Sequence, residues 1–216
     1  ALETARRRLV FEESFVLQLG LLGIKGRSLT QTAVQIGRDY TAEFCSALPF
    51  SLTGAQSRAV ADCVEDMRRS TPMNRLLQGD VGSGKTLVAA GCIWAAAQSG
   101  KVSVMMAPTE ILAEQHHASL EKLFAPMGME VILLTGSMTP KQKRNIRERI
   151  ELGLVQVVVG THALLTDATK FSDLGLVIAD EQHRFGVEQR ARLWTKNQQP
   201  PHILVMTATP IPRTLA

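Results

Sequence analysis

The 216-residue sequence lacks the features that mark three large classes of protein. Its cysteines, Cys45, Cys63 and Cys92, are odd in number and show no Cys-x-x-Cys spacing, so neither a disulfide framework nor a zinc site is expected. The longest uncharged run, residues 86–100, is too short to cross a bilayer. Charged residues interrupt the apolar ones at the start of the sequence, so this stretch lacks the continuous apolar segment of a signal peptide. We therefore expect packed thiols in a reducing compartment and no membrane partner.

Charge and composition constrain the partner only weakly. The formal net charge of +4 and the pI near 9.2 slightly favour a polyanion, although many proteins that bind none carry as much charge. No internal repeat or low-complexity segment is present. The length and the apolar content of 45% suffice for one main domain with a substantial core and a smaller appended element.

Residues 79–86 are the most informative stretch. They fit the phosphate-loop pattern G-x-x-x-x-G-K-[ST], with a short apolar strand before them and a helical pattern over 87–98 after them. Glycines allow backbone N–H groups to surround phosphates, and the following helix offers its positive N-terminal end. We expect Lys85 to reach the terminal phosphates and the Thr86 hydroxyl to bind Mg²⁺. The predicted nucleotide-binding loop consists of Gly79, Asp80, Val81, Gly82, Ser83, Gly84, Lys85 and Thr86.

Short apolar runs alternate with helical patterns along the chain. Runs without polar alternation are typical of parallel strands that are buried on both sides. Predicted strands cover 75–78, 102–106, 131–134, 155–159, 174–179 and 203–206, and predicted helices cover 52–70, 87–98, 109–124 and 140–152. We therefore predict an α/β fold of the P-loop NTPase class, a parallel sheet with helices on both faces. Ligands of such sheets bind beyond the carboxyl ends of the strands.

A small all-helical segment is predicted before this sheet. One apolar face runs over residues 1–23, and a weaker pattern runs over 28–48, interrupted at Gly37. We interpret both as packing elements without a chemical role. After them, Thr53 and Gln56 have the spacing of a capping box and predict a helix start.

An acidic pair follows the strand predicted over 174–179. Adjacent residues that leave a strand point in different directions, so Asp180 can hold Mg²⁺ while Glu181 orients or deprotonates the attacking water. This role is favoured over a solvated turn because a phosphate loop upstream needs an acidic Mg²⁺ partner at such a strand end.

Other strand ends are less specific. The proline-containing loop 207–213 and the stretches 107–110, 134–137 and 160–162 suit phosphate contacts, but ordinary turns explain each about equally well. Five cations between 141 and 149 are more simply a solvated helix face. The adjacent His116 and His117 do not share a helix face, as a metal pair would.

The order of these motifs resembles superfamily 2 helicases of the DEAD/DEAH type. In that family a RecA-like lobe carries a glutamine motif, a Walker A loop, DNA-contacting loops, an acidic box and a Ser/Thr-Ala-Thr motif. The resemblance implies a first RecA-like ATP-binding lobe over 48–216 and a helical linker over 1–47, with ATP and Mg²⁺ as cofactors. Implied adenine contacts are Phe50 and Gln56. Implied catalytic residues are Lys85, Asp180, Glu181 and His183, with Thr86 and Asp180 on Mg²⁺. Implied DNA contacts are Pro108, Thr109, Gly136, Thr161 and His162, and implied coupling residues are Gln182, Arg184, Thr207 and Thr209.

Longer stretches resemble one bacterial branch of this superfamily, the translocases that remodel stalled replication forks and Holliday junctions. The stretches are 48–50, 78–86, 107–116, 180–187 and 206–215. The motor of transcription-repair coupling factors shares the Arg-Phe-Gly-Val and Thr-Ala-Thr-Pro-Ile-Pro-Arg-Thr-Leu signatures but usually has Asp-Glu-Glu in the acidic box. Gln182 therefore favours the branched-DNA translocases.

This resemblance implies branched or double-stranded DNA as the partner, in the bacterial cytoplasm at the nucleoid. The alternative is a module that binds ATP without turnover. In the resembled proteins a wedge domain recognises the junction and a second RecA-like lobe supplies arginine fingers. We expect both as partners of this lobe within one protein, and we expect the 216 residues alone to bind ATP but to hydrolyse it poorly.

Overall fold

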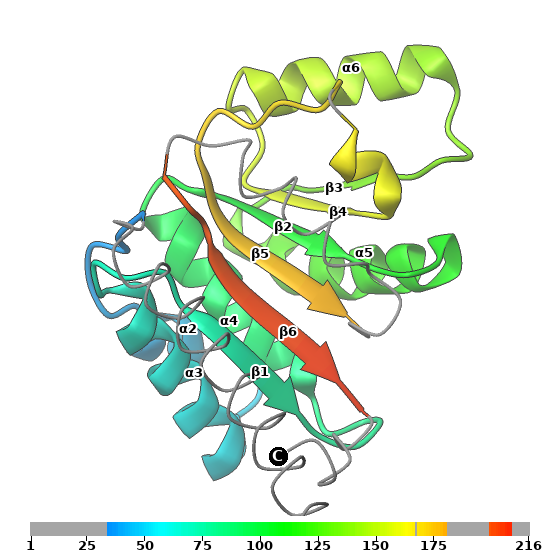
Figure 1. Cartoon of the computed structure of the whole chain (residues 1–216). Helices are drawn as coiled ribbons and strands as arrows, with labels where there is room; N and C mark the ends of the chain where they lie inside the picture. Colours follow the sequence, from blue (N-terminus) through cyan, green and yellow to red (C-terminus); the bar gives the residue numbers. More distant parts are fainter. Residues whose placement is uncertain (1–33, 167, 181–198, 209–216) are drawn as a thin grey trace, which may run out of the picture.

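The computed structural model describes residues 34–166, 168–180 and 199–208, so the helix predicted over 1–23 lies outside it. Its centre is a six-stranded sheet in the order β1-β6-β5-β2-β4-β3 (Figure 1). Every strand pairing is parallel, which confirms the predicted sheet. The strands are β1 (Asn74–Gln78), β2 (Val102–Met106), β3 (Val131–Leu134), β4 (Val157–Gly160), β5 (Leu174–Asp180) and β6 (His202–Thr207).

Helices cover both faces of this sheet, as predicted. One face carries α2 (Thr41–Ala47), α3 (Gly54–Met67), α4 (Lys85–Gln98) and α5 (Glu110–Phe124), which the 3₁₀ helix η1 (Ala125–Met127) extends. The other face carries α6 (Pro140–Glu151) and the 3₁₀ helix η2 (His162–Leu165). Val102, Val104 and Met106 of β2 belong to the core under α6, and Met105 belongs to the core under α4, so both sides of the strand are buried, which explains its largely apolar sequence. In the described ranges, no helix combines the length and apolar character needed to span a bilayer.

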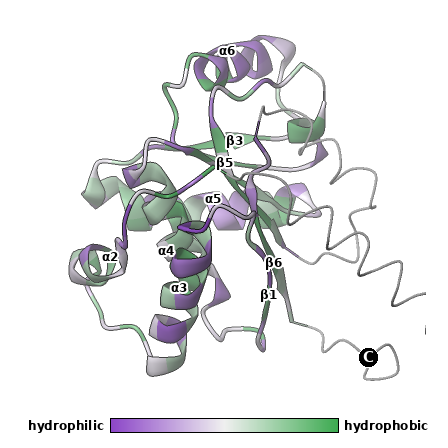
Figure 2. Ribbon diagram, turned by 60° about the vertical axis from the view of Figure 1, so that its left-hand side comes forward, coloured by the Kyte–Doolittle hydropathy of each residue, from purple (hydrophilic) through white to green (hydrophobic). Residues whose placement is uncertain are grey.

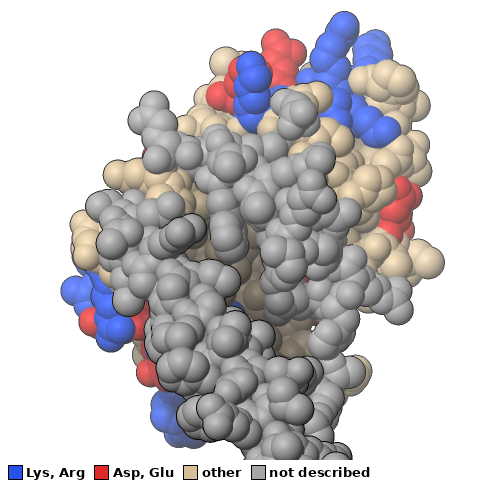
Figure 3. Space-filling model, viewed as in Figure 1, with Lys and Arg blue, Asp and Glu red and all other residues tan. Residues whose placement is uncertain are grey.

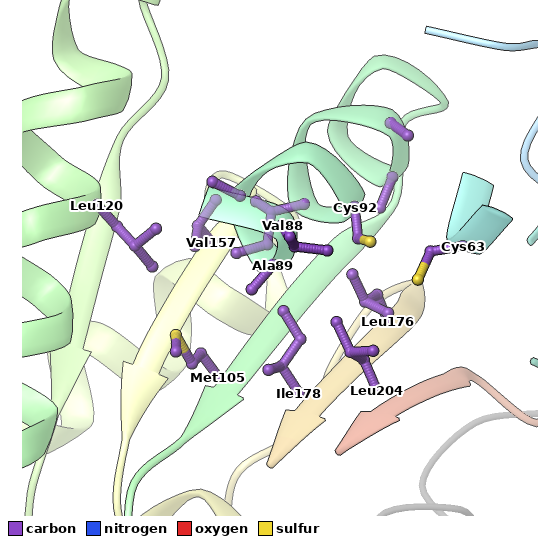
Figure 4. Packing of buried hydrophobic residues seen from close by; sticks show 14 of the residues in the cluster. Cys63, Val88, Ala89, Cys92, Met105, Leu120, Val157, Leu176, Ile178 and Leu204 are labelled. Atoms are coloured by element: carbon purple, nitrogen blue, oxygen red, sulfur yellow. The ribbon is translucent and has the colours of Figure 1, made fainter. Parts of the chain in front are cut away.

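Helix α4 lies at the centre of the first core. Figure 4 shows its side chains Val88 and Ala89 beside Ile178 of the sheet, and all three belong to one buried cluster. Gly91 allows α3 to approach closely, because a Cβ at Gly91 would lie 2.7 Å from Cγ1 of Val60. The packing of α3 on α4 therefore depends on the missing side chain at this position.

Two free thiols lie where α3 meets α4. Cys63 and Cys92 are both buried (Figure 4), whereas Cys45 in α2 is half-buried. The hydrogen bond between the two buried thiols lowers the pKa of Cys63, and the same bond together with burial raises the pKa of Cys92. These thiols belong to the core, as their predicted packing role requires.

Helix α6 has a different character. Ile150 is its one buried residue. Figure 2 shows it as largely hydrophilic, and in Figure 3 Lys and Arg side chains gather where Figure 1 places this helix. The predicted solvated face is confirmed, although Lys143 and Arg147 also donate hydrogen bonds to neighbouring loops.

The helix predicted over 28–48 is wrong for residues 34–40, which form neither helix nor strand. Backbone groups here bind neighbouring elements instead of one another: the N–H of Ile36 donates to the oxygen of Met67 at 3.1 Å. The Asp39 carboxylate accepts the N–H of the first residue of α2 at 2.8 Å, a local bond that favours a helix start. The segment is therefore an irregular strap that binds the ends of α3 and α4.

A buried histidine fastens this strap to the sheet. The Nδ1 atom of His202 accepts the N–H of Met73 at 3.0 Å, and its Nε2–H donates to the oxygen of Val34 at 2.5 Å. Burial lowers the pKa of His202 below its ordinary value, so the ring is neutral and carries its proton on Nε2. Both ring nitrogens are thus satisfied inside the core.

Candidate nucleotide and nucleic-acid site

Residues 79–84 form the predicted phosphate loop between β1 and α4. Gly82 and Gly84 have φ angles of 81° and 83°, in the left-handed region that favours glycine. A Cβ at Gly84 would lie 2.3 Å from Nε2 of Gln56, and one at Gly79 would lie 2.7 Å from Oγ of Ser83. The loop is therefore a tight backbone cradle of the kind that surrounds phosphate.

Lys85 begins α4, and its side chain turns back over this loop. Its Nζ atom donates to the backbone oxygens of Gly79 at 2.6 Å and of Asp80 at 2.9 Å. The ammonium group is therefore already held at the cradle and can exchange these carbonyls for phosphate oxygens. Thr86 lies in the first turn of the same helix, at its positive end.

Gln56 braces the loop from the start of α3. Its Oε1 atom accepts the N–H of Thr53 at 2.9 Å, and the Thr53 hydroxyl accepts the N–H of Gln56 at 3.3 Å, which confirms the predicted capping box. The Nε2 atom of the same side chain donates to the oxygen of Ser83 at 2.9 Å. Sequence reasoning missed this second contact because the two residues are 27 positions apart. The predicted adenine contacts of Gln56 and Phe50 stay predictions; Phe50 is 46% exposed and available for stacking.

Strand register brings two further predicted residues to the same edge of the sheet. Thr207 pairs with Gln78, and Asp180 pairs with Met206. The backbone oxygen of Thr207 accepts the N–H of Gly79 at 3.2 Å, so the end of β6 contacts the phosphate loop directly. With β6 between them, β1 and β5 lie about 10 Å apart, twice the usual strand spacing.

His116 of α5 holds Asp180. Its Nε2 atom lies 2.7 Å from Oδ2 of Asp180, and the two side chains are only 14% and 13% exposed. The Nε2 atom of His117 lies 3.0 Å from the oxygen of Val131, so the adjacent histidines bind different partners. The bond to Asp180 was not predicted, because it joins residues 64 positions apart and depends on β5 lying beside β2.

The donor set at this edge fits Mg²⁺ that arrives with a nucleotide. Hydroxyl and carboxylate oxygens, as on Thr86 and Asp180, are hard ligands, and Mg²⁺ usually keeps waters and phosphate oxygens as its other ligands. Within 34–166, 168–180 and 199–208, no three His, Cys, Asp or Glu residues are grouped to hold a metal. The site therefore suits an ion shared with phosphate better than one enclosed by protein.

The predicted DNA-contacting loops meet at one surface. Oε1 of Glu110 accepts the N–H of Ser137 at 2.9 Å, and a Cβ at Gly136 would lie 3.8 Å from the ring of His162. Lys143 of α6 donates to the oxygen of Gly136 at 2.5 Å. Hydrogen bonding with Ser137, through its side chain and its backbone N–H, lowers the pKa of Glu110. Three loops that are distant in sequence thus share one polar surface.

The predicted contact residues differ in their access to this surface. Gly136 and His162 are exposed, and Pro108 and Thr109 are half-buried. The Thr109 hydroxyl caps α5 by accepting the N–H at position 112. Thr161 is only 2% exposed and its buried hydroxyl has no hydrogen-bond partner, so it meets no phosphate in this conformation. The predicted turn after β4 is in fact η2, which buries apolar residues 163–165.

Several predicted residues lie outside the described part of the chain. They are Glu181, Gln182, His183, Arg184 and Thr209. Their catalytic and coupling roles stay predictions. Thr207, which the structure describes, is 2% exposed and contacts the phosphate loop through its backbone oxygen.

Known proteins resemble this chain over its whole length. The family model described as DEAD/DEAH box helicase matches residues 53–216. ATP-dependent DNA helicase RecG of Synechocystis sp. is 50% identical, with coverage of 100% of this chain and 26% of the relative. The RecG proteins of Bacillus subtilis and Escherichia coli K12 are each 49% identical, with coverage of 100% and 98% of this chain and 32% and 31% of the relatives. The chain thus spans about a quarter to a third of the length of these proteins.

Solved structures of helicases also resemble the chain. A structure of RecG bound to a three-way DNA junction has a TM-score of 0.85 at 43% identity, covering 100% of this chain and 29% of that one. Mycobacterium smegmatis helicase Lhr bound to ssDNA and AMP-PNP has a TM-score of 0.60 at 22% identity, covering 82% of this chain and 25% of that one, which supports the fold alone. The sheet therefore has the RecA-like helicase fold.

Proposed function

The chain belongs to the DEAD/DEAH box helicase family, and from that premise we propose that it is the first motor lobe of a RecG-type DNA translocase. The whole protein hydrolyses ATP to move on double-stranded DNA at branched junctions, and so remodels forks and Holliday junctions in repair and recombination in the bacterial cytoplasm. One observation carries this proposal. The phosphate loop, Asp180 and the polar loops around Gly136 all lie at the carboxyl edge of one sheet.

The nucleotide binds on the β1 side of this edge. Backbone N–H groups of residues 79–84 and the Lys85 ammonium hold the phosphates, and Thr86 and Asp180 hold Mg²⁺. When bound, Mg²⁺ supplies positive charge to the phosphate oxygens. Glu181 follows Asp180 directly and orients the attacking water. His183 completes the catalytic set implied by the family resemblance.

The nucleic acid binds at the same carboxyl edge of the sheet, but beyond the ends of β3 and β4. Exposed Gly136 and His162, together with Pro108 and Thr109, contact the DNA backbone, which positions a duplex without reading its sequence. The bond between Thr207 and Gly79 connects the Ser/Thr-Ala-Thr motif to the phosphate loop, which supports a coupling role for 207–209. Gln182 and Arg184 take part in the same coupling. The rest of the protein supplies a junction-recognising wedge and a second RecA-like lobe.

The test compares the 216-residue chain with a version extended through the second lobe of the same protein. We expect both to bind Mg·ATP, and only the extended chain to hydrolyse it rapidly, with stimulation by forked DNA. The expected difference is large because arginine fingers contribute about 10³ to 10⁵ in GTPases. DNA-stimulated turnover by the short chain alone would refute the need for groups outside it. Binding without stimulated turnover in the extended chain would instead identify a binding module.

Point variants make this test specific. Lys85→Ala should weaken nucleotide binding at least tenfold, because it removes a cation from the phosphates. The matched control is Lys101→Ala: Lys101 pairs with Asp173 before β2 and β5, at the opposite edge of the sheet. Glu181→Gln in the extended chain should abolish hydrolysis and spare binding. Equal nucleotide affinities for the Lys85 and Lys101 variants would exclude the proposed site.

A further inference from the structure

We infer that His116 is a positioning residue that orients Asp180 toward the Mg²⁺ site and connects it through α5 to the loop at residues 136–137. This inference rests on the proposed function, because it assumes that Asp180 serves Mg²⁺. It concerns a side chain that the family motifs considered above leave without a role, and it is carried by one short hydrogen bond between two mostly buried groups.

The bond constrains the Asp180 carboxylate. Nε2 of His116 lies 2.7 Å from Oδ2, which fixes one carboxylate oxygen and leaves Oδ1 to face other ligands. Asp180 is the last residue of β5, so its backbone is fixed by the parallel pairing with β6 while its side chain stands at the strand end. A carboxylate held at both its backbone and one oxygen presents the remaining oxygen in a defined direction. Partners of this kind typically raise metal affinity by about 10- to 100-fold.

Helix α5 connects this bond to the candidate DNA surface. In its first turn, Glu110 accepts the N–H of Ser137, and just before it Thr109 caps the helix. His116 follows about two turns later, about 10 Å along the helix axis. Ala113, Leu120 and Phe124 are buried along the same helix, in the core that includes residues of β3 and β4. A displacement at the 136–137 loop therefore reaches Asp180 through one continuous helix.

The first experiment measures how Mg²⁺ supports binding of a fluorescent ATP analogue to the 216-residue chain. His116→Leu keeps the volume but removes the donor. We expect it to bind the analogue without Mg²⁺ as the parent does, and to need about tenfold more Mg²⁺ for half-saturation. His116→Gln places an amide N–H at a similar reach and should restore Mg²⁺ dependence to within about twofold of the parent.

Two further variants separate the possible failures. His117→Leu removes the neighbouring bond to Val131, and should leave Mg²⁺ dependence unchanged. A His116→Leu chain that responds to Mg²⁺ like the parent would overturn the inference, as would a folded His116→Gln chain that behaves like His116→Leu. Failure of the proposed function looks different: the parent itself would bind no nucleotide in a Mg²⁺-dependent way, or Asp180→Asn would leave its Mg²⁺ dependence unchanged.

The connection through α5 has its own readout. In the parent, forked DNA should change the affinity for the Mg²⁺-bound analogue, and by linkage the Mg²⁺-bound analogue changes DNA affinity by the same factor. This factor should fall toward one in His116→Leu and persist in His117→Leu. A His116→Leu chain with the parental factor would show that the two sites communicate by another route and would overturn this part of the inference.

Discussion

Helices α4 and α6 cover opposite faces of one sheet and are held there by different forces. After Lys85, α4 carries no charged residue, and its core-facing side chains are mostly alanine, glycine and cysteine. α6 is rich in lysine, arginine and glutamate, and buries Ile150 alone. Ile146 packs against the same core, and Arg147 adds hydrogen bonds to the hydroxyls of Thr166 and Thr169 at 3.2 Å each.

Under the proposed function, this difference gives the nucleotide and the DNA different surroundings. The phosphate loop leads directly into α4, so the geometry of the loop depends on the close packing of that helix. Close packing tolerates small changes of side-chain volume poorly. The loop at Gly136 lies beside α6, whose cations stay near water and adjust with little cost in packing energy. The proposed nucleotide site is therefore a rigid cradle, and the proposed DNA surface has an adaptable, charged border.

The largest expected effect comes from Gly84→Ala in the cradle. Gly84 has φ 83°, which strains an alanine, and a Cβ there would meet Nε2 of Gln56 at 2.3 Å, so the Gln56 side chain must move and give up its bond to the Ser83 oxygen of the loop. We expect nucleotide affinity to fall at least tenfold in a fluorescence titration. Gly128→Ala is the control, because Gly128 has φ 73° but open space around it. It should cost about 1 kcal/mol of stability and leave binding unchanged. Parental affinity in Gly84→Ala would contradict the rigid cradle.

Gly91→Ala should reveal the sensitivity of the α4 packing to added volume, through a loss of stability. The added methyl group would lie 2.7 Å from Val60, within the contact between α3 and α4. Overpacking of this kind costs about 1–3 kcal/mol, measurable by urea unfolding. Gly37→Ala adds the same methyl group where nothing lies within 4 Å, and should change stability by less than about 0.5 kcal/mol. Equal unfolding midpoints for the two variants would show that α4 can shift freely.

Local features of this architecture could be predicted from the sequence. The bounds of β2 and β3, the capping box at Thr53 and the phosphate loop all follow from neighbouring residues, through apolar runs, N-cap chemistry and glycine geometry. The other strands differ from prediction by one or two residues, β1 and β5 at one end and β4 and β6 at both ends. Such ends depend on how far the partner strand extends.

Features that depend on the order of the strands could not be predicted. The hydrogen bonds of Gln56 with Ser83 and of His116 with Asp180 join residues that only the folded sheet brings together. The strap at 34–40 has a helix-compatible sequence, but its backbone N–H groups bind Met67 at the end of α3 and Ser99 just after α4. Tertiary contacts outweigh a weak local propensity here.

His202 allows a pH-dependent test of the core under α4, because this buried histidine fastens the strap at residues 34–40 to the sheet. Because burial lowers its pKa, the unfolded chain binds a proton below about pH 6.5 that the folded chain resists. Its contribution to the free energy of unfolding is therefore complete above that pH and is lost as pH falls. His202→Gln should be less stable than the parent by about 1–3 kcal/mol at pH 7.5, with a smaller difference at pH 5. A difference independent of pH would contradict a neutral buried ring.

The smallest effect is expected on α6. Arg149 donates two hydrogen bonds to Glu130, at 3.1 and 2.6 Å, but both side chains are substantially exposed. Arg149→Ala should lower the free energy of unfolding by less than about 1 kcal/mol, and 1 M salt should reduce the difference further. A loss as large as that of Gly91→Ala would mean that α6 is held as tightly as α4.

The position of β6 determines when the nucleotide site is completed during synthesis. β6 is the last strand along the described chain, yet it lies between β1 and β5, and β1 pairs with β6 alone. As the chain leaves the ribosome, β2 to β5 can pair before residues 202–207 emerge, while β1 has no strand beside it. The backbone oxygen of Thr207, which accepts the N–H of Gly79 at the start of the phosphate loop, also belongs to β6. A nascent chain therefore gains its nucleotide site in one late step, after most of the sheet has formed.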